Sequence, residues 1–103
     1  MKVFVYLLDL FIPLNISSEE VMNSFEKDNL KPFELVKDVV KRELGEIKKV
    51  RFYNSYTSSN GFLIEYLVDF RCGQASVKII CAEDPRKVLI DYYKAEKESF
   101  HYG

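Results

Sequence analysis

The most regular pattern in the chain is a period of two between residues 62 and 81. The even-numbered residues from Phe62 to Cys72 and the odd-numbered residues from Ala75 to Cys81 are apolar or aromatic. Such alternation predicts two strands that each bury one face. A two-residue turn at Gly73 and Gln74 brings even positions opposite odd ones and places both apolar sets on the same face.

Two further strands are predicted. The alternation of Val50, Phe52, Asn54 and Tyr56 predicts a strand before the turn sequence TSSNG. The buried even positions of this strand must pair with the buried even positions of the next strand. A loop with an odd number of residues is therefore expected, with Gly61 in a bulge. The N-terminal residues 3–8 are apolar on both alternate faces, which indicates a strand covered on both sides. Asp9 is expected near its end, in contact with solvent or a lysine.

Three stretches have the period of 3.6 that is typical of helices, at about 18–28, 32–44 and 85–98. Their ends are marked by Ser17 and Glu20 at capping-box spacing, Pro32 in a first turn, Gly45 as a left-handed cap, Asp84 as an N-cap and Pro85 after it. Residues 99–103 are expected to fray. The sequence predicts one α+β domain over residues 1–103, a two-layer β-α-α-β-β-β-α sandwich. Its mostly antiparallel sheet has about four strands, with helices on one face.

Composition narrows the class of protein. With 103 residues and a formal charge of −1, the chain can bury a core and has no strong field for generic polyanion binding. The N-terminal apolar run is interrupted by Asp9 and ended by Pro13, so neither a signal peptide nor a membrane span is predicted, and a cytoplasmic location is expected. Abundant Lys and Glu with a single Gln suit a heat-adapted source such as an archaeon or an archaeal virus or plasmid.

The cysteines predict no disulfide. With the turn at Gly73 and Gln74, Cys72 and Cys81 lie roughly 20 Å apart along the sheet, beyond disulfide range. Two buried thiols are expected instead.

The face opposite the predicted core carries apolar residues among its charges. Four of them are expected to form a partner-binding patch: Tyr53, Leu63, Leu67 and Ile80. Ile90 and Tyr93 fall off the buried stripe of the last helix, and either extend this contact surface or pack into the core. The leading hypothesis is a non-enzymatic protein-binding module, expected to be a homodimer, without a cofactor or a metal.

Two alternatives stay open. The order helix, three strands, helix over residues 32–98 resembles double-stranded RNA-binding domains, which implies phosphate contacts at the start of the last helix and a loop, YTSSNG, for a minor groove. The basic residues available for nucleic acid are Arg51, Arg71, Lys78, Arg86 and Lys87.

The third hypothesis is a metal-dependent nuclease. It rests on Glu65, Asp69 and Lys78 on one sheet face, although Ser76 stands where that pattern needs an acid. Cross-strand ion pairs explain the same residues. The only histidine, His101, lies in the tail, so no Ser-His or Cys-His pair is expected in the folded domain.

Overall fold

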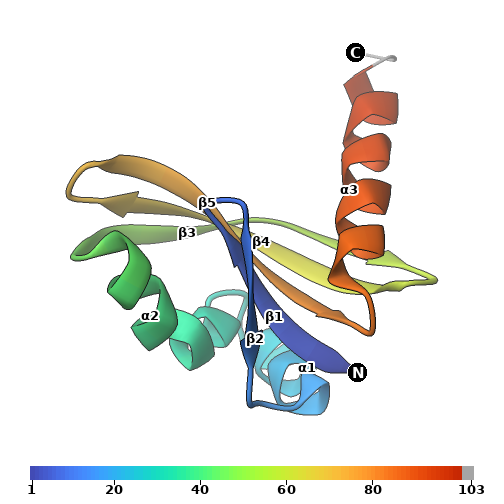
Figure 1. Ribbon diagram of the computed structural model, residues 1–103, viewed down its shortest axis with the longest axis horizontal. Helices are drawn as coiled ribbons and strands as arrows, with labels where there is room; N and C mark the ends of the chain where they lie inside the picture. Colours follow the sequence, from blue (N-terminus) through green and yellow to red (C-terminus); the bar gives the residue numbers. More distant parts are fainter. Residues whose placement is uncertain (101–103) are drawn as a thin grey trace.

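The computed structural model describes the backbone of residues 1–100 and the side chains of residues 1–98. Its elements are β1 (Lys2–Leu7), β2 (Leu10–Leu14), α1 (Ser18–Lys27), α2 (Lys31–Leu44), β3 (Ile47–Ser58), β4 (Gly61–Phe70), β5 (Gly73–Ala82) and α3 (Pro85–Phe100). The strands form one antiparallel sheet in the order β2-β1-β5-β4-β3 (Figure 1). The predicted α+β class is confirmed, with five strands in place of four.

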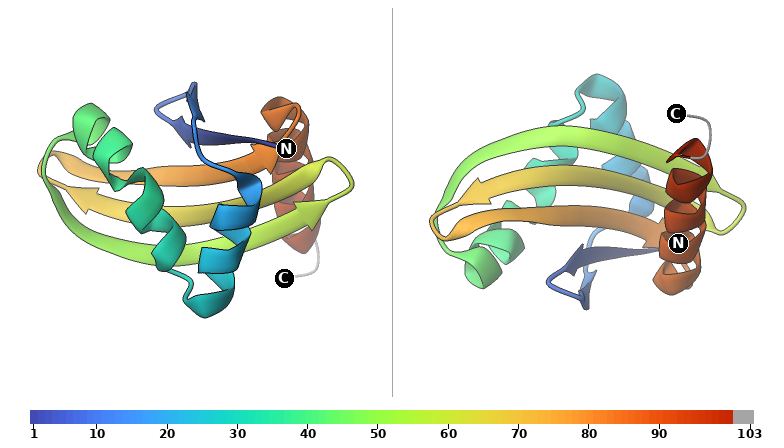
Figure 2. Two further views of the ribbon diagram at one scale, coloured as in Figure 1. Left: turned by 90° about the horizontal axis from the view of Figure 1, so that it is seen from below. Right: turned by 90° about the horizontal axis from the view of Figure 1, so that it is seen from above.

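The helices lie on both faces of the sheet, so the prediction of helices on one face needs correction. Helices α1 and α2 cover one face, where Val21, Phe33 and Val36 pack on the strands. Helix α3 crosses the other, which we call the outer face, and buries Val88 and Leu89 there. Figures 1 and 2 show α3 rising away from one end of the sheet, so that the outer face is only partly covered.

The N-terminal segment is a hairpin instead of a single strand. Leu8 and Asp9 form a two-residue turn with φ values of 51° and 63°, and the chain returns as β2, the fifth strand. Positive φ at both turn positions is the geometry that matches the twist of a hairpin. Asp9 is exposed at this turn and accepts a hydrogen bond from the Tyr6 hydroxyl at 3.1 Å, so its predicted contact with solvent is confirmed.

The β3–β4 hairpin changes parity inside a strand, where the sequence analysis expected an odd loop. Two residues, Ser59 and Asn60, make the turn, and the register shifts between Phe52 and Asn54. Tyr53 is therefore the extra residue of a bulge. Beyond it, Asn54 and the half-buried Tyr56 turn to the outer face. Their predicted place beside Phe52 was wrong.

The β4–β5 turn lies two residues earlier than predicted. Phe70 pairs with Gly73, so Arg71 and Cys72 form the turn and Phe62 pairs with Cys81. The partner of each β5 residue moves by four positions, which is an even number. Even positions still meet odd ones, so the predicted core residues remain on one face.

The predicted helix starts at Ser17 and Asp84 and the predicted cap at Gly45 are confirmed. The Ser17 hydroxyl oxygen accepts a hydrogen bond from the Glu20 N–H at 3.1 Å, Asp84 accepts one from the Arg86 N–H at 3.1 Å, and Gly45 has a φ of 84°. Helix α3 continues to Phe100, so residues 99 and 100, which were expected to fray, are helical. The rest of the predicted tail, including His101, lies outside the described residues. Among the described residues, no helix is long and apolar enough to cross a membrane.

The two cysteines differ in exposure, which corrects the expectation of two buried thiols. Cys72 is exposed in the β4–β5 turn, Cys81 is buried, and both are free. Burial raises the pKa of the Cys81 thiol to about 11, from 9.0, because the buried thiolate is poorly solvated.

At mildly alkaline pH, we expect Cys72 to react rapidly with iodoacetamide and Cys81 to react only as the chain unfolds. Since the Cys81 thiol ionises near pH 9.0 when unfolded and near pH 11 when folded, its contribution to stability is complete below pH 9.0 and is lost as the pH rises through 11. Peptide mass spectrometry after timed labelling measures both rates. Equal rates for the two thiols would contradict the prediction.

Candidate functional site

A row of five side chains crosses all five strands on the outer face. Each pairs with the next across the sheet in the order Phe11, Tyr6, Lys78, Glu65 and Asn54. We call these five residues the cross-sheet row. It places a cation and an anion at the centre of the sheet, with two aromatic rings towards the β2 edge.

The centre of the row is a buried, hydrogen-bonded ion pair. Glu65 and Lys78 are only 7% and 5% exposed, and Lys78 Nζ lies 3.6 Å from Glu65 Oε2. The Ser76 hydroxyl donates to Glu65 Oε2 at 2.7 Å and accepts from Lys78 Nζ at 2.9 Å. The Tyr92 hydroxyl of α3 donates to Glu65 Oε1 at 2.6 Å. Both carboxylate oxygens therefore have a donor as well as the counter-charge.

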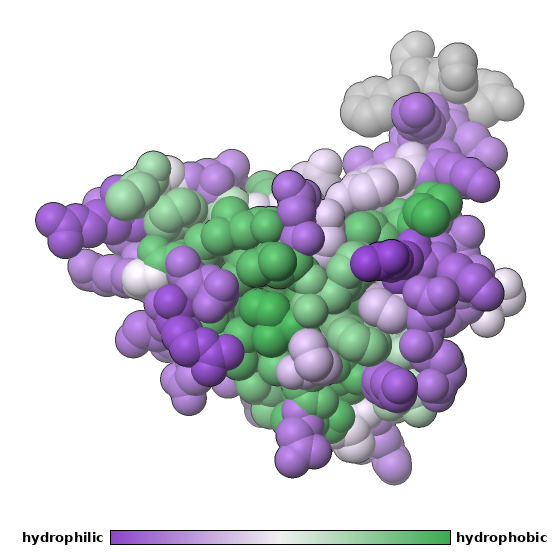
Figure 3. Space-filling view, in the orientation of Figure 1, coloured by the Kyte–Doolittle hydropathy of each residue, from purple (hydrophilic) through white to green (hydrophobic). Residues whose placement is uncertain are grey.

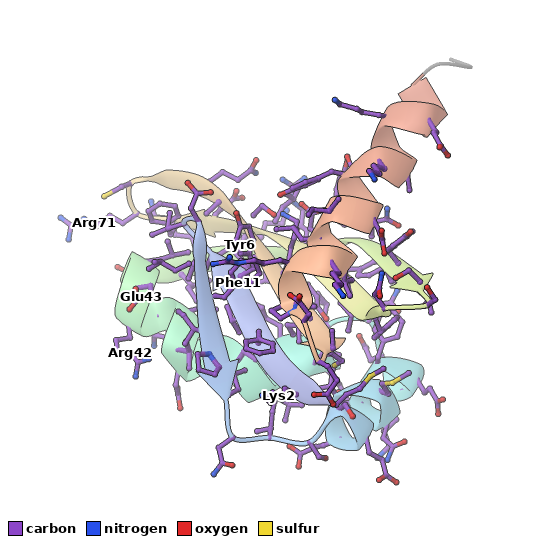
Figure 4. The ribbon with its side chains drawn as sticks, turned by 45° about the vertical axis from the view of Figure 1, so that its right-hand side comes forward. Lys2, Tyr6, Phe11, Arg42, Glu43 and Arg71 are labelled. Atoms are coloured by element: carbon purple, nitrogen blue, oxygen red, sulfur yellow. The ribbon has the colours of Figure 1, made fainter. Side chains whose placement is uncertain are left out.

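Cations also connect α3 to the β1–β2 hairpin. Lys78 Nζ lies 5.6 Å from the ring centroids of both Tyr6 and Tyr93, and the Arg86 guanidinium carbon lies 5.9 Å from that of Phe11. These separations are within the range of cation–π attraction. The Tyr6 and Phe11 rings are 4.6 Å apart, and Figure 4 shows them together beside the first turns of α3.

The network fastens α3 to the sheet. Burial first, and then its hydrogen bond to the Glu65 carboxylate, raise the pKa of the Tyr92 hydroxyl, so Tyr92 remains a donor well above neutral pH. Among the described side chains, no buried nitrogen or oxygen lacks a hydrogen-bond partner. Such a satisfied network fixes one position of the helix on the sheet.

The structure divides the predicted partner patch. Leu63 and Ile80 are 0% exposed because Val88 and Leu89 of α3 pack in the same cluster. They belong to the interior, and their predicted exposure was wrong. Tyr53 is 53% exposed at the β3 bulge, and Leu67 is half-buried on the outer face. The four residues do not form one free surface.

The basic residues proposed for nucleic acid are also separated. Lys78 is buried in the ion pair. Arg51 and Arg71 are exposed at one end of the sheet, and Figure 4 shows Arg71 far from α3. Arg86 and Lys87 are exposed at the start of α3, beyond the other end of β5, which is roughly 30 Å long. The five do not line a single strip.

The proposed nuclease carboxylates do not converge. Glu65 and Asp69 are four residues apart on β4, which is roughly 13 Å in a strand. Asp69 instead accepts a hydrogen bond from the Gln74 amide at 2.8 Å. Within the described part of the chain, no group of three His, Cys, Asp or Glu residues could hold a metal ion.

Sequence reasoning missed the most exposed apolar surface of the hairpin. Leu8 and Leu10 at its tip are 57% and 52% exposed, and Ile90 and Tyr93 on α3 are 53% and 44% exposed. Figure 3 shows hydrophobic residues gathered over β2, at the centre of the face towards the viewer. In the sequence, the positions of Ile90 and Tyr93 off the buried stripe of the last helix indicated their exposure. No sequence feature indicated the hairpin turn.

Comparison with known proteins assigns no family. No family model, no curated protein and no solved structure matches the chain significantly. Function is therefore inferred from the geometry of the chain itself.

Proposed function

We propose that this protein is a protein-binding module that forms a homodimer through the hairpin–helix surface. We define this surface by Leu8, Phe11, Ile90 and Tyr93. The observation that carries the proposal is that Leu8 at the hairpin tip and Ile90 and Tyr93 on α3 are each more than 40% exposed. Cation–π contacts of Lys78 with Tyr93 and of Arg86 with Phe11 join α3 to the outer face of the hairpin. A gathered apolar surface of this kind is typical of a contact site.

The hairpin turn supports a role in contact. Leu8 and Asp9 both adopt left-handed backbone conformations. For a leucine this conformation costs roughly 1–2 kcal/mol, which Asn or Gly would largely avoid. Asp9 is held by the Tyr6 hydroxyl, but Leu8 gains little burial in the monomer. A strained residue with an exposed apolar side chain fits a place where another molecule covers it.

The edge of β2 favours side-chain contact over strand pairing. Its five residues, LFIPL, are all apolar, and among the described residues no strand lies on its outer side. Leu7 and Leu10 flank the two-residue turn, so alternate residues bond to β1 while Phe11 and Pro13 direct their backbone outwards. Proline has no N–H to offer there. The edge therefore presents apolar side chains with few backbone donors.

A second copy of the chain fits this surface electrostatically. A two-fold contact brings the same patch against itself, so any charge on it must find its opposite on the same patch. Here Asp9 lies at the hairpin tip, and Arg86 lies over Phe11 at the start of α3. Across the two-fold axis, Asp9 of each copy can face Arg86 of the other copy. This pairing is complementary at both ends of the surface.

Sedimentation velocity tests the dimer. The wild type is expected to sediment with about twice the monomer mass of 12.1 kDa. Ile90→Glu is expected to weaken association by at least about tenfold, because it places a carboxylate in an apolar contact. Met22→Glu is the matched control, since Met22 is 42% exposed on α1, away from this surface. A monomeric wild type, or equal effects of both variants, would contradict the proposal.

A second variant tests the hairpin itself. Leu8→Asn with Asp9→Gly supplies the preferred residues for this turn. In the monomeric Ile90→Glu variant, these two changes are expected to raise the free energy of unfolding by about 1 kcal/mol. In the wild-type background, the same two changes are expected to weaken the dimer. If they stabilise the monomer and leave the dimer intact, Leu8 is not at the interface.

A further inference from the structure

A second surface, far from the hairpin in the sheet order, combines an open strand edge with a basic cavity. The cavity has a volume of about 220 Å³ and lies between α2 and the start of β3. The residues that line it are Leu30, Phe33, Glu34, Lys37, Ile47, Lys48, Lys49 and Val50. We call this site the α2–β3 groove.

The backbone of β3 faces outwards along this groove. β3 is the last strand of the sheet, and it is regular between the register shifts at Ile47/Lys49 and Phe52/Asn54. Ser58 and Gly61 flank a two-residue turn, so they bond to each other, and every second residue of β4 from Gly61 faces β3.

The same alternation identifies the β3 residues whose backbone groups do not bond to β4. Leu67 and Asp69 of β4 face β3 and pair with Arg51 and Lys49. The residues between and beside these pairs, Val50 and Phe52, therefore direct their N–H and C=O groups away from the sheet. A strand added at this edge would find two such positions in succession.

The charge of the groove selects an acidic ligand. Its lining residues include three lysines, Lys37, Lys48 and Lys49, against the single acidic residue Glu34. Arg51 adds a further exposed cation on the same strand. A second β3 edge would bring like charges together, which opposes self-pairing, whereas an acidic strand would be attracted.

The two sides of β3 define the pattern of the ligand. On the side of α2, the groove has an apolar floor of buried Phe33 and half-buried Ile47 and Val50. On the outer face, Lys49 and Arg51 are exposed opposite Asp69 and Leu67. Successive side chains of a strand point to opposite faces, so an added strand would meet apolar groups on one side and cations on the other.

We propose that the α2–β3 groove binds an extended segment of a partner protein in which acidic and apolar residues alternate, as an added strand on β3. The acidic side chains lie towards Lys49 and Arg51, and the apolar ones lie towards Phe33 and Val50. This site is separate from the hairpin–helix surface, because β3 and β2 are opposite edges of the sheet.

Fluorescence anisotropy with a short labelled peptide of alternating Glu and Val tests the proposal. The peptide is expected to bind the wild type at low salt, and a peptide of alternating Lys and Val is not. Lys48→Glu with Lys49→Glu is expected to weaken binding by at least about tenfold. The matched control is Lys2→Glu with Lys94→Glu, which reverses two exposed lysines elsewhere. The Ile90→Glu variant should bind as the wild type does, which separates this site from the dimer.

Backbone pairing has its own test. A peptide N-methylated at alternate residues on its pairing edge keeps its side chains but loses the hydrogen bonds to β3, so it is expected to bind at least about tenfold more weakly. Equal binding of both peptides, or no binding of the acidic peptide, would overturn the proposal. So would tighter binding of a single-stranded oligonucleotide that the Lys48→Glu, Lys49→Glu variant abolishes, since the groove would then be a phosphate site.

Discussion

Lys78→Met is expected to lower the free energy of unfolding by about 3–5 kcal/mol, because it leaves the Glu65 carboxylate buried without a counter-charge. Glu65 is 7% exposed, and its remaining contacts would be the hydroxyl groups of Ser76 and Tyr92. Neutral donors replace little of the lost attraction in a site of low polarity. Urea unfolding followed by circular dichroism measures the loss.

Two further variants show whether charge is the cause. Adding Glu65→Gln to Lys78→Met removes both charges while keeping an acceptor for Tyr92, and is expected to recover most of the stability. Lys2→Met is the matched control, since Lys2 is an exposed lysine on β1 and its loss should change stability by less than about 0.5 kcal/mol. If the double variant is no more stable than Lys78→Met, packing of the lysine side chain, and not its charge, accounts for the loss.

The buried side of the sheet could be predicted from the sequence because its signal is local. Tyr66 and Val68 on β4, and Val77 and Ile79 on β5, are all 0% exposed, as the period of two indicates. The predicted core residues were right although the β4–β5 turn was misplaced, because a shift by an even number of residues keeps every side chain on its face. The caps at Ser17, Gly45 and Asp84 were predictable for the same local reason.

The outer face could not be predicted because it depends on where α3 packs. β4 reads FLIEYLVDF, which is apolar on both faces over most of its length, and such strands are usually covered on both sides. At the centre of β4, only Glu65 interrupts this apolar pattern. Its burial becomes acceptable once Tyr92, 27 residues later, reaches it. Without that contact, Glu65 and Lys78 are read as exposed ion pairs, and Leu63 and Ile80 as a free patch.

The errors at the N-terminal hairpin and at the β3 bulge have physical reasons as well. Leu8 and Asp9 adopt a turn that strongly favours Asn and Gly, so the hairpin has no sequence signature. The Tyr53 bulge leaves the alternation of β3 intact in the sequence while reversing its faces in the sheet. This reversal is what brings Asn54 into the cross-sheet row, where its amide lies 3.4 Å from the Tyr92 hydroxyl.

Gly61→Ala is expected to destabilise the fold by about 3 kcal/mol or more, because the added methyl group has no space. Gly61 has a φ of +151°, and a Cβ built there would lie 2.3 Å from the Cys81 carbonyl oxygen and 3.0 Å from Val88 Cγ2. The carbonyl belongs to the neighbouring strand, so it cannot move without disturbing the β4–β5 pairing. Val88 belongs to α3, so the helix would be displaced as well.

Gly73→Ala is the matched control for Gly61→Ala. Gly73 has nearly the same φ, +150°, and follows a two-residue turn in the same way, but a Cβ there meets nothing within 4 Å. Its loss of stability should reflect the backbone conformation alone, about 1 kcal/mol. The difference between the two variants in urea unfolding therefore isolates the close approach of β4, β5 and α3 at Gly61. Equal losses would mean that this approach relaxes without penalty, and that α3 is less firmly seated than the cross-sheet row implies.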